Sequence, residues 1–319
     1  MTSRLARRIA VSFMLAATFS LAAPGHAAGH PAPAASSIDR IASEFMLLPN
    51  IVYRTANNVP LKLDLYLPPN RKPPVPVVML IHGGGWVAGN KEEMGLWALP
   101  YLAMSWAVVN VEYRLAESSP APAAVEDCRC ALGWILQNAE EHGLDPKRIV
   151  TTGASAGGHL ALTTGMLTPA AGFDRGCQAK RTMDYWGVGA PPMPKVAAIV
   201  NWFGITDVAG MLEGGRDARG YAIEWIGNAS NPVALAKSVS PIDMITRGMP
   251  PVLTIHGDQD PWVPYSDGVR LHEALQKAGV PNELLTIAGG KHGDFSSAEN
   301  DRIWTAIRTF LSKHGLPAS

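Results

Sequence analysis

Gly153-Ala154-Ser155-Ala156-Gly157 stands between two segments of different character. Residues 148–152 before it (Arg-Ile-Val-Thr-Thr) contain four consecutive β-branched residues, a pattern typical of a buried strand. Residues 156–167 after it are rich in alanine and leucine, which favour a helix. A turn that joins a strand directly to a helix has no room for side chains at its flanks, which accounts for Gly153 and Gly157. This stretch therefore predicts an α/β fold with the hydroxyl of Ser155 exposed on a strained turn.

The same alternation of strands and helices extends outward along the chain. Apolar runs typical of strands covered on both faces lie at residues 75–81, 106–111, 148–152, 197–202 and 251–255, with a shorter one at 284–287. Helical patterns lie between them, at residues 122–142, 156–167, 266–278 and 298–314. Such an alternation predicts a mostly parallel central sheet flanked by helices.

The N-terminal part of this sheet is predicted to be antiparallel. Residues 61–67 alternate apolar and polar side chains, which indicates a half-exposed edge strand, and residues 51–54 are expected to pair with them. No second set of strands and no long hydrophilic linker follows, so we predict a single domain over residues 41–315. Residues 168–194 and 206–249 are long connections for such a domain, and long excursions often form lids.

The first 28 residues have the pattern of a secretory signal peptide. Arg4, Arg7 and Arg8 precede an apolar run at 9–23, and small residues follow. The alternative is an N-terminal helix of the fold. We expect export to the periplasm or the extracellular space, with residues 29–40 as a flexible leader rich in proline, alanine and serine.

Composition and charge exclude several classes of protein. Apolar residues make up 47% and charged residues 17%, which excludes an intrinsically disordered chain. Lys and Arg number 27, as do Asp and Glu, and removal of the three N-terminal arginines leaves a slight acidic excess. Nucleic-acid binders carry a basic excess, so we expect no nucleic-acid partner. No later apolar stretch is long enough for a membrane-spanning helix, and no membrane partner is expected.

An oxidising compartment would allow a disulfide among the three cysteines. Cys128 and Cys130 are two residues apart on a predicted helix, so their side chains point in different directions. Cys128 shares a helix face with Ala131 and Ile135, so the preferred pairing joins Cys130 to Cys177. Three reduced cysteines are the alternative. No C-x-x-C pair occurs, so a zinc site with thiolate ligands is not expected, and no cofactor is expected.

His82-Gly83-Gly84-Gly85-Trp86 follows the predicted strand at residues 75–81. Consecutive glycines let a backbone turn sharply and present its N–H groups to a ligand oxygen, as acyl transfer needs at the tetrahedral intermediate. We expect the amides of Gly84, Gly85 and Ala156 to form an oxyanion hole; the alternative is a glycine-rich turn without a ligand. The side chain of His82 is expected to orient the loop by a hydrogen bond to the backbone of the loop. Trp86 is expected either to wall the acyl pocket or to pack in the core.

Ser155 then needs a base and a carboxylate that orients this base. Asp258 and Asp260 follow the predicted strand at 251–255, and His292 follows the one at 284–287. Both positions are at carboxyl ends of strands, where open α/β sheets place their sites. The chain order serine, acid, histidine is that of an α/β-hydrolase. We expect Asp260 to hold the imidazole of His292, and Asp258 to stabilise its own loop.

The remaining histidines are expected to have other roles. His159 lies one helical turn after Ser155 and should point away from the tip of the turn. His256 ends a strand beside the acid loop, where a structural hydrogen bond is expected. The others lie in or beside the leader, or at helical positions expected to be solvated: His26, His30, His142, His272 and His314.

Together these motifs resemble the alpha/beta-hydrolase esterase/lipase superfamily, nearest the bacterial acetyl-xylan and feruloyl esterase-like proteins with the HGGGW pattern seen at residues 82–86. The resemblance also rests on segments in the expected order: Tyr113-Arg114-Leu115-Ala116, Asp127 with Trp134, Gly153–Leu160, Trp202-Phe203-Gly204, Ser240-Pro241, His256–Pro264 and the segment around His292. It implies a serine carboxylic-ester hydrolase without a metal, with Ser155, Asp260 and His292 as its triad.

Two features depart from this family pattern. Glu117 stands where relatives commonly have proline, after the Tyr-Arg-Leu-Ala stretch. Residues 172–194, which include Cys177, Tyr185 and Trp186, have no recognised counterpart in the family, and they are candidates for substrate contacts.

We therefore expect a secreted carboxylesterase that acts on small or polysaccharide-linked esters of a carbohydrate, a phenolic acid or a short acyl group. Two alternatives stay open. An amide or formamide hydrolase would use the same triad, as the similar arylformamidases and prolyl-oligopeptidase-type peptidases do. A non-catalytic binding protein is the other, because a fold alone does not prove activity. No oligomeric state is predicted.

Overall fold

The computed structural model describes residues 44–69, 71–177, 195–213 and 219–318. The predicted signal peptide (1–28) and leader (29–40) lie outside these residues, and so does the 178–194 part of the predicted first excursion, with Tyr185 and Trp186. The single domain at residues 41–315 stays a prediction.

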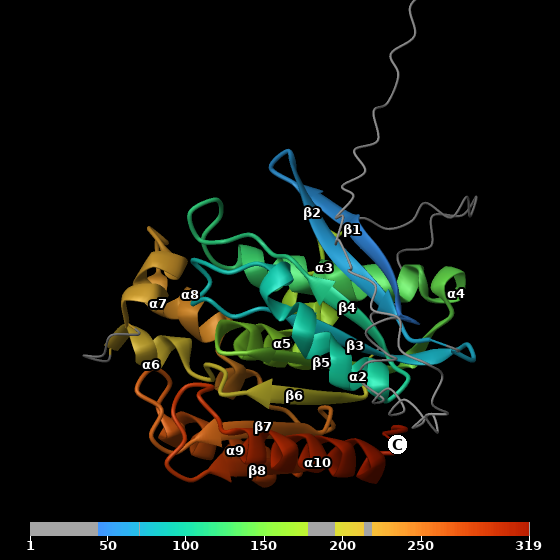
Figure 1. Cartoon of the computed structure of the whole chain (residues 1–319). Coiled ribbons are helices and arrows are strands. Elements are labelled where there is room, and N and C mark those ends of the chain that lie inside the picture. Colours follow the sequence, from blue (N-terminus) through green and yellow to red (C-terminus); the bar gives the residue numbers. More distant parts are fainter. Residues whose placement is uncertain (1–43, 70, 178–194, 214–218, 319) are drawn as a thin grey trace, which may run out of the picture. The chain divides into compact units, whose positions relative to one another are not determined.

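Within the described residues, eight strands form one sheet in the order β1-β2-β4-β3-β5-β6-β7-β8 (Figure 1). β1 pairs with β2 and β2 with β4 in antiparallel fashion, and the other neighbours are parallel. This confirms the mostly parallel α/β sheet. The strands are β1 (Met46–Ala56), β2 (Val59–Leu67), β3 (Val75–Ile81), β4 (Ala107–Val111), β5 (Leu144–Ala154), β6 (Ala198–Trp202), β7 (Val252–Gly257) and β8 (Asn282–Ile287).

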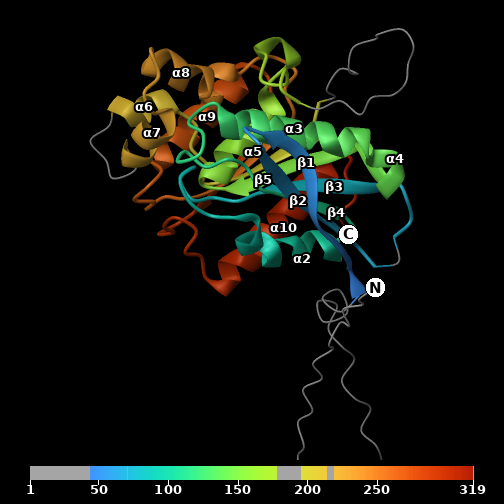
Figure 2. The same ribbon diagram turned by 90° about the horizontal axis from the view of Figure 1, so that it is seen from above.

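Helices cover both faces of the sheet and bury a hydrophobic core on each (Figure 2). On one face pack α3 (Ala123–Gln137), α5 (Ala156–Met166) and α9 (Tyr265–Lys277). On the other pack the 3-10 helix η1 (Lys91–Ala98), α2 (Leu99–Ala103) and α10 (Ser297–Lys313). The described residues also contain shorter helices: α4 (Ala139–His142), η2 (Pro169–Ala171), α6 (Val208–Glu213), α7 (Arg219–Ile226), α8 (Pro232–Ser238) and η3 (Pro241–Met244).

The prediction of an edge strand at residues 61–67 was wrong. β2 lies between β1 and β4, and it is buried or half-buried from Leu61 onward, because the eleven-residue β1 covers the outer edge. The polar side chain of Asp64 is accommodated there by the buried Lys91, whose Nζ lies 2.9 Å from its Oδ2. An alternating pattern therefore does not require exposure where a partner satisfies the buried polar residue.

The predicted helix at residues 122–142 divides into α3 and α4 at Asn138. The side-chain amide of Asn138 donates to the carbonyl of Trp134 at 2.7 Å, as does its backbone N–H at 3.0 Å. Asparagine competes for backbone hydrogen bonds in this way, which favours a helix end over a helix interior. The short helix α4 then leads into β5.

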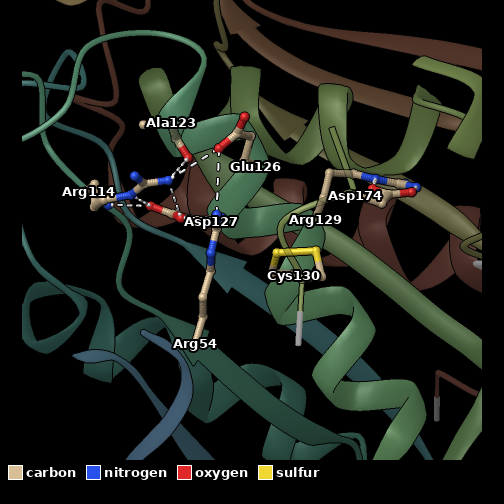
Figure 3. Close-up of a disulfide and its surroundings, with 9 residues drawn as sticks. Arg54, Arg114, Ala123, Glu126, Asp127, Arg129, Cys130 and Asp174 are labelled. Atoms are coloured by element: carbon tan, nitrogen blue, oxygen red, sulfur yellow. Dashed lines mark hydrogen bonds and ion pairs between the residues drawn. A yellow bond between two sulfur atoms is a disulfide. The ribbon is translucent and has the colours of Figure 1, made fainter. Parts of the chain in front are cut away.

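A buried ion cluster links the N-terminal hairpin to helix α3 (Figure 3). The carboxylate of Asp127, which is fully buried, accepts hydrogen bonds from Arg54 of β1 at 2.8 Å and from the Nε and Nη2 atoms of Arg114 at 2.7 and 2.8 Å. Glu126 lies within 3.7 Å of both guanidinium groups. A buried carboxylate needs such partners, so this cluster fixes the segment after β4 against α3.

Cys130 of α3 and Cys177 are joined by a disulfide, with their Cα atoms 4.9 Å apart. This is the pairing that the sequence favoured, and Cys128 is reduced and buried. Next to the disulfide, Arg129 makes two hydrogen bonds to the carboxylate of Asp174, at 2.6 and 2.7 Å (Figure 3). Covalent and ionic links thus hold the segment after η2 to helix α3.

A thiol assay is expected to find one free thiol, that of Cys128, after denaturation without reductant. Because the linked residues are 47 apart, the loop-entropy relation gives the cross-link roughly 4 kcal/mol of stabilisation. The Cys130→Ser variant should therefore unfold at a lower temperature than the wild type. Three free thiols, or an unchanged melting temperature, would contradict this prediction.

Candidate active site

The turn at Ser155 joins β5 directly to α5. Ser155 has φ 57° and ψ −121°, a conformation that non-glycine residues rarely adopt. Its backbone N–H donates to the carbonyl of Trp202 at the end of β6, at 2.9 Å. A Cβ atom at Gly153 or Gly157 would clash with the carbonyl of Ile81 on β3. Both glycines are therefore needed for close packing, and the neighbouring strands hold the strained turn in place.

The glycine-rich loop after β3 borders the same pocket as Ser155. Gly84 and Gly85 have φ values of 104° and 61°, and a side chain at Gly84 would clash with the carbonyl of Ala88. Neither of their amides donates a hydrogen bond to another described residue. Ala156 begins helix α5, so its amide lacks an intrahelical acceptor. All three amides thus have the hydrogen-bonding capacity that an oxyanion hole requires.

His82 stabilises the beginning of this loop. Its Nδ1 lies 2.8 Å from the carbonyl of Gly83, and its ring stacks on that of Tyr113 with the centroids 4.1 Å apart. Burial lowers the pKa of His82 to about 4, so the ring is neutral at ordinary pH. Its interaction with the loop backbone agrees with the predicted orienting role.

The loops after β7 and β8 bring Asp260 and His292 together, because these two strands are parallel neighbours. The Nδ1 atom of His292 lies 2.7 Å from Oδ2 of Asp260. The other oxygen of Asp260 accepts the backbone N–H groups of Trp262 and Val263 at 2.8 and 2.9 Å. Asp258 instead accepts the backbone N–H of Gly289 at 2.7 Å. Asp260 thus contacts the imidazole of His292, whereas Asp258 joins its own loop to the loop after β8.

The surroundings of Asp260 keep it ionised. Burial raises the pKa of this carboxyl, but hydrogen bonds from His256 and His292 outweigh burial and hold the pKa well below its ordinary value. His256 is fully buried, with its Nε2 atom 3.1 Å from the carbonyl of Val263 and 3.2 Å from Asp260. It therefore makes a structural contact beside the acid, and His292 remains the ring that reaches the pocket.

One pocket of about 350 Å³ is lined by Ser155, His292, Gly84 and Gly85 together. This volume lies in the range of small-molecule sites. The rest of the lining is mostly apolar and includes Trp86, Phe203, Ile205, Met211, Tyr221 and Trp262. Tyr221 and Trp262 are 40% and 39% exposed with their ring centroids 6.2 Å apart, so they form an accessible aromatic pair on the pocket wall.

Several pocket residues could not be predicted from the sequence. The predicted excursion at residues 206–249 contains the helices α6, α7 and α8, and it contributes Met211 and Tyr221 to the pocket. Its length was the available signal, but side chains in short helices cannot be assigned to a pocket without the tertiary fold. Trp86 combines both predicted roles, since it is fully buried and also lines the pocket.

The predicted solvent exposure of His272 was wrong. Its side chain is buried on the face of α9 that packs on β8, and its Nδ1 lies 2.9 Å from Oδ1 of Asn282. In the described part of the chain, no three His, Cys, Asp or Glu side chains are grouped so that they would bind a metal ion. No described helix has the length and apolarity to cross a membrane.

Comparison with known proteins extends these observations. The BD-FAE family model matches residues 63–275. Carboxylesterase NlhH of Mycobacterium tuberculosis is 29% identical over 252 residues, which cover 76% of this chain and 72% of the relative. Esterase LipQ of the same species is 25% identical over 261 residues, covering 78% of this chain and 58% of the relative.

Solved esterase structures have the same fold. A propionate-bound structure of esterase Est2 from Thermogutta terrifontis has a TM-score of 0.69 and 28% identity, covering 85% of this chain and 95% of that one. A truncated carbohydrate esterase from gut microbiota has a TM-score of 0.67 and 26% identity, and the match covers 85% of this chain and 96% of that one. The sheet order, the strained serine turn and these matches agree, and the protein is a serine ester hydrolase of the alpha/beta-hydrolase fold that belongs to the BD-FAE family.

Proposed function

We propose that the protein is an exported carboxylesterase in which Ser155, His292 and Asp260 form the catalytic triad. One observation carries this proposal: the strained Ser155 lines the same pocket as His292, and the Nδ1 atom of His292 lies 2.7 Å from Asp260. Nucleophile, base and orienting acid come from three separate loops at the carboxyl ends of β5, β8 and β7. This is the arrangement that a serine esterase needs.

In the proposed mechanism, His292 donates a hydrogen bond from its Nδ1–H group to the carboxylate of Asp260, keeps that proton, and takes the proton of Ser155 on Nε2. The Ser155 oxygen attacks the ester carbonyl, and the amides of Gly84, Gly85 and Ala156 stabilise the negative oxygen of the tetrahedral intermediate. His292 then returns the proton to the leaving alcohol, which produces the acyl-enzyme. Water repeats the steps and releases the acid. Asp260 stays ionised and stabilises the imidazolium.

The pocket favours esters with a short acyl group or an aromatic acid. Its volume of about 350 Å³ and its apolar lining suit a small apolar acyl group. The exposed pair Tyr221 and Trp262 provides flat faces on which a sugar or phenolic ring can pack. A carbohydrate esterase and a propionate-bound esterase among the similar structures support this substrate class.

Export is the second part of the proposal. The N-terminal residues 1–28 have the pattern of a secretory signal peptide. The disulfide between Cys130 and Cys177 supports this proposal, because such bonds persist in oxidising compartments and are rare in the cytosol.

A panel of substrates tests the proposal with the purified protein. We expect turnover of p-nitrophenyl acetate and p-nitrophenyl propionate, a decline with long acyl chains that exceed the pocket, and release of acetate or ferulate from acetylated xylan or methyl ferulate. Formylated amines serve as the amide comparison and should react more slowly. Absence of ester hydrolysis would favour a binding protein on this fold, and faster hydrolysis of formamides would favour the amidase alternative.

A further inference from the structure

Three buried aromatic side chains pack behind the glycine-rich loop. They are Trp86 of the loop, His159 of α5 and Trp225 of α7, and all three are fully buried. The indoles of Trp86 and Trp225 stack with centroids 4.3 Å apart and planes at 10°. The ring of His159 meets both indoles edge-on, at 5.1 and 5.3 Å. The loop, the nucleophile helix and α7 thus share one aromatic cluster.

Hydrogen bonds determine which nitrogen of His159 carries the proton. The indole Nε1 of Trp86 lies 3.1 Å from Nδ1 of His159, and an indole N–H can only donate, so Nδ1 is the acceptor. The Nε2 atom lies 2.7 Å from the carbonyl of Val239 and therefore carries the hydrogen. Burial lowers the pKa of His159 to about 4, so this neutral form prevails at ordinary pH.

Trp86 occupies a position where the backbone needs support. Its φ of 63° lies in the left-handed region, which is unusual and strained for a non-glycine residue. It directly follows Gly85, whose amide belongs to the proposed oxyanion hole. A change in the orientation of Trp86 would therefore move Gly85.

Helix α7 packs on the same part of the loop. Tyr221 and Trp225 are four residues apart and share a face of this helix. Trp225 stacks on Trp86, and the Tyr221 ring lies so close to Gly85 that a Cβ atom there would be 2.8 Å from it. The loop is thus held between α7 and the His159 side chain of α5.

We propose that His159 is a positioning residue for catalysis: by accepting the indole hydrogen bond of Trp86, it fixes the loop whose Gly84 and Gly85 amides stabilise the oxyanion. The inference rests on the proposed function, since it assigns His159 a role through that oxyanion hole. His159 does not touch the substrate, because it is fully buried and is not part of the pocket lining.

Two substitutions of nearly equal shape separate the hydrogen bond from the packing. In His159→Asn, the side-chain oxygen occupies roughly the place of Nδ1 and can accept from Trp86. In His159→Leu, a side chain of similar size cannot. Both variants lose the bond to Val239. We expect His159→Leu to lower kcat on p-nitrophenyl acetate by about 10- to 100-fold with KM within about 3-fold of wild type, and His159→Asn to stay within about 5-fold in kcat.

Three measurements complete the test. The fraction of active enzyme is titrated with a fluorophosphonate, so that misfolded protein does not lower the measured kcat. The indole N–H resonance of Trp86, assigned through Trp86→Phe, should move in His159→Leu and be retained in His159→Asn. In the Trp86→Phe background the Asn and Leu variants should agree within about 2-fold, because the donor is gone.

Any of three results would overturn the proposal. They are a wild-type kcat in His159→Leu, an equal loss of kcat in His159→Leu and His159→Asn, and a difference in kcat between these two variants that persists in the Trp86→Phe background. Failure of the proposed triad is recognised separately, by activity that survives Ser155→Ala in an otherwise wild-type chain.

Discussion

Replacing Ser155 with alanine is expected to lower kcat/KM on p-nitrophenyl acetate by about 10⁴- to 10⁶-fold. The substitution removes the nucleophile, so no acyl-enzyme can form. Only binding and the oxyanion hole would then accelerate the reaction. Alanine should be tolerated at φ 57° as serine is, because the added strain comes from the Cβ atom that both residues possess. The melting temperature should therefore change little.

A surface serine provides the matched control for this prediction. Ser238 is exposed at the end of α8, and its hydroxyl donates only to the nearby carbonyl of Leu235. Ser238→Ala is expected to keep wild-type activity. Labelling with diisopropyl fluorophosphate should modify the peptide that contains Ser155 in the wild type and in Ser238→Ala, but not in Ser155→Ala. Activity above about 1% in Ser155→Ala would remove this residue from the mechanism.

Asp260→Asn is expected to lower kcat by about 10⁴-fold with a small effect on KM. The Asp260 carboxylate accepts a hydrogen bond from the Nδ1–H group of His292, with Nδ1 2.7 Å from Oδ2, whereas the amide nitrogen of asparagine in that place would donate to Nδ1. The ring would then carry its proton on Nε2, and this nitrogen would be unable to take the proton of Ser155. The side-chain oxygen that accepts from Trp262 and Val263 is kept, so the loop should hold its shape.

Asp258→Asn is the control for this second prediction. Asp258 lies two residues before Asp260 in the sequence. Its Oδ1 accepts a hydrogen bond from the backbone N–H of Gly289, and the side-chain oxygen of an asparagine can accept the same bond. We expect kcat to stay within about 5-fold of wild type, as for a residue that only stabilises a loop. A larger loss in Asp258→Asn than in Asp260→Asn would reverse the two assignments.

The lowered pKa of Asp260 also predicts how stability depends on pH. A carboxyl whose pKa is lower in the folded than in the unfolded protein contributes stability above the unfolded pKa of about 4, and this contribution disappears as the pH falls toward the folded pKa. The melting temperature of the wild type should therefore fall relative to that of Asp260→Asn as the pH is lowered below 4. An unchanged difference between the two would contradict the pKa shift.

Much of the framework was predictable because it depends on local signals. Residues 75–81 are apolar throughout and form β3 with the same boundaries, since a strand buried on both faces needs an apolar side chain at every position. The strand, turn and helix around Ser155 were equally clear, because only small residues fit its flanks. The prediction of solvent exposure failed where a residue distant in the sequence satisfies a buried polar side chain. Asp64 suggested exposure, and its contact with Lys91, 27 positions further along the chain, reverses that conclusion.

The sequence by itself determined the α/β order of elements, the two glycine-rich turns and the chain order of Ser155, Asp260 and His292, because each depends on neighbouring residues and on strand ends. Only the tertiary structure decided that α7 forms part of the pocket, that His159 contacts Trp86, and that Cys130 pairs with Cys177. These contacts join residues that are tens of positions apart, and their side chains meet only after the sheet and its covering helices have packed.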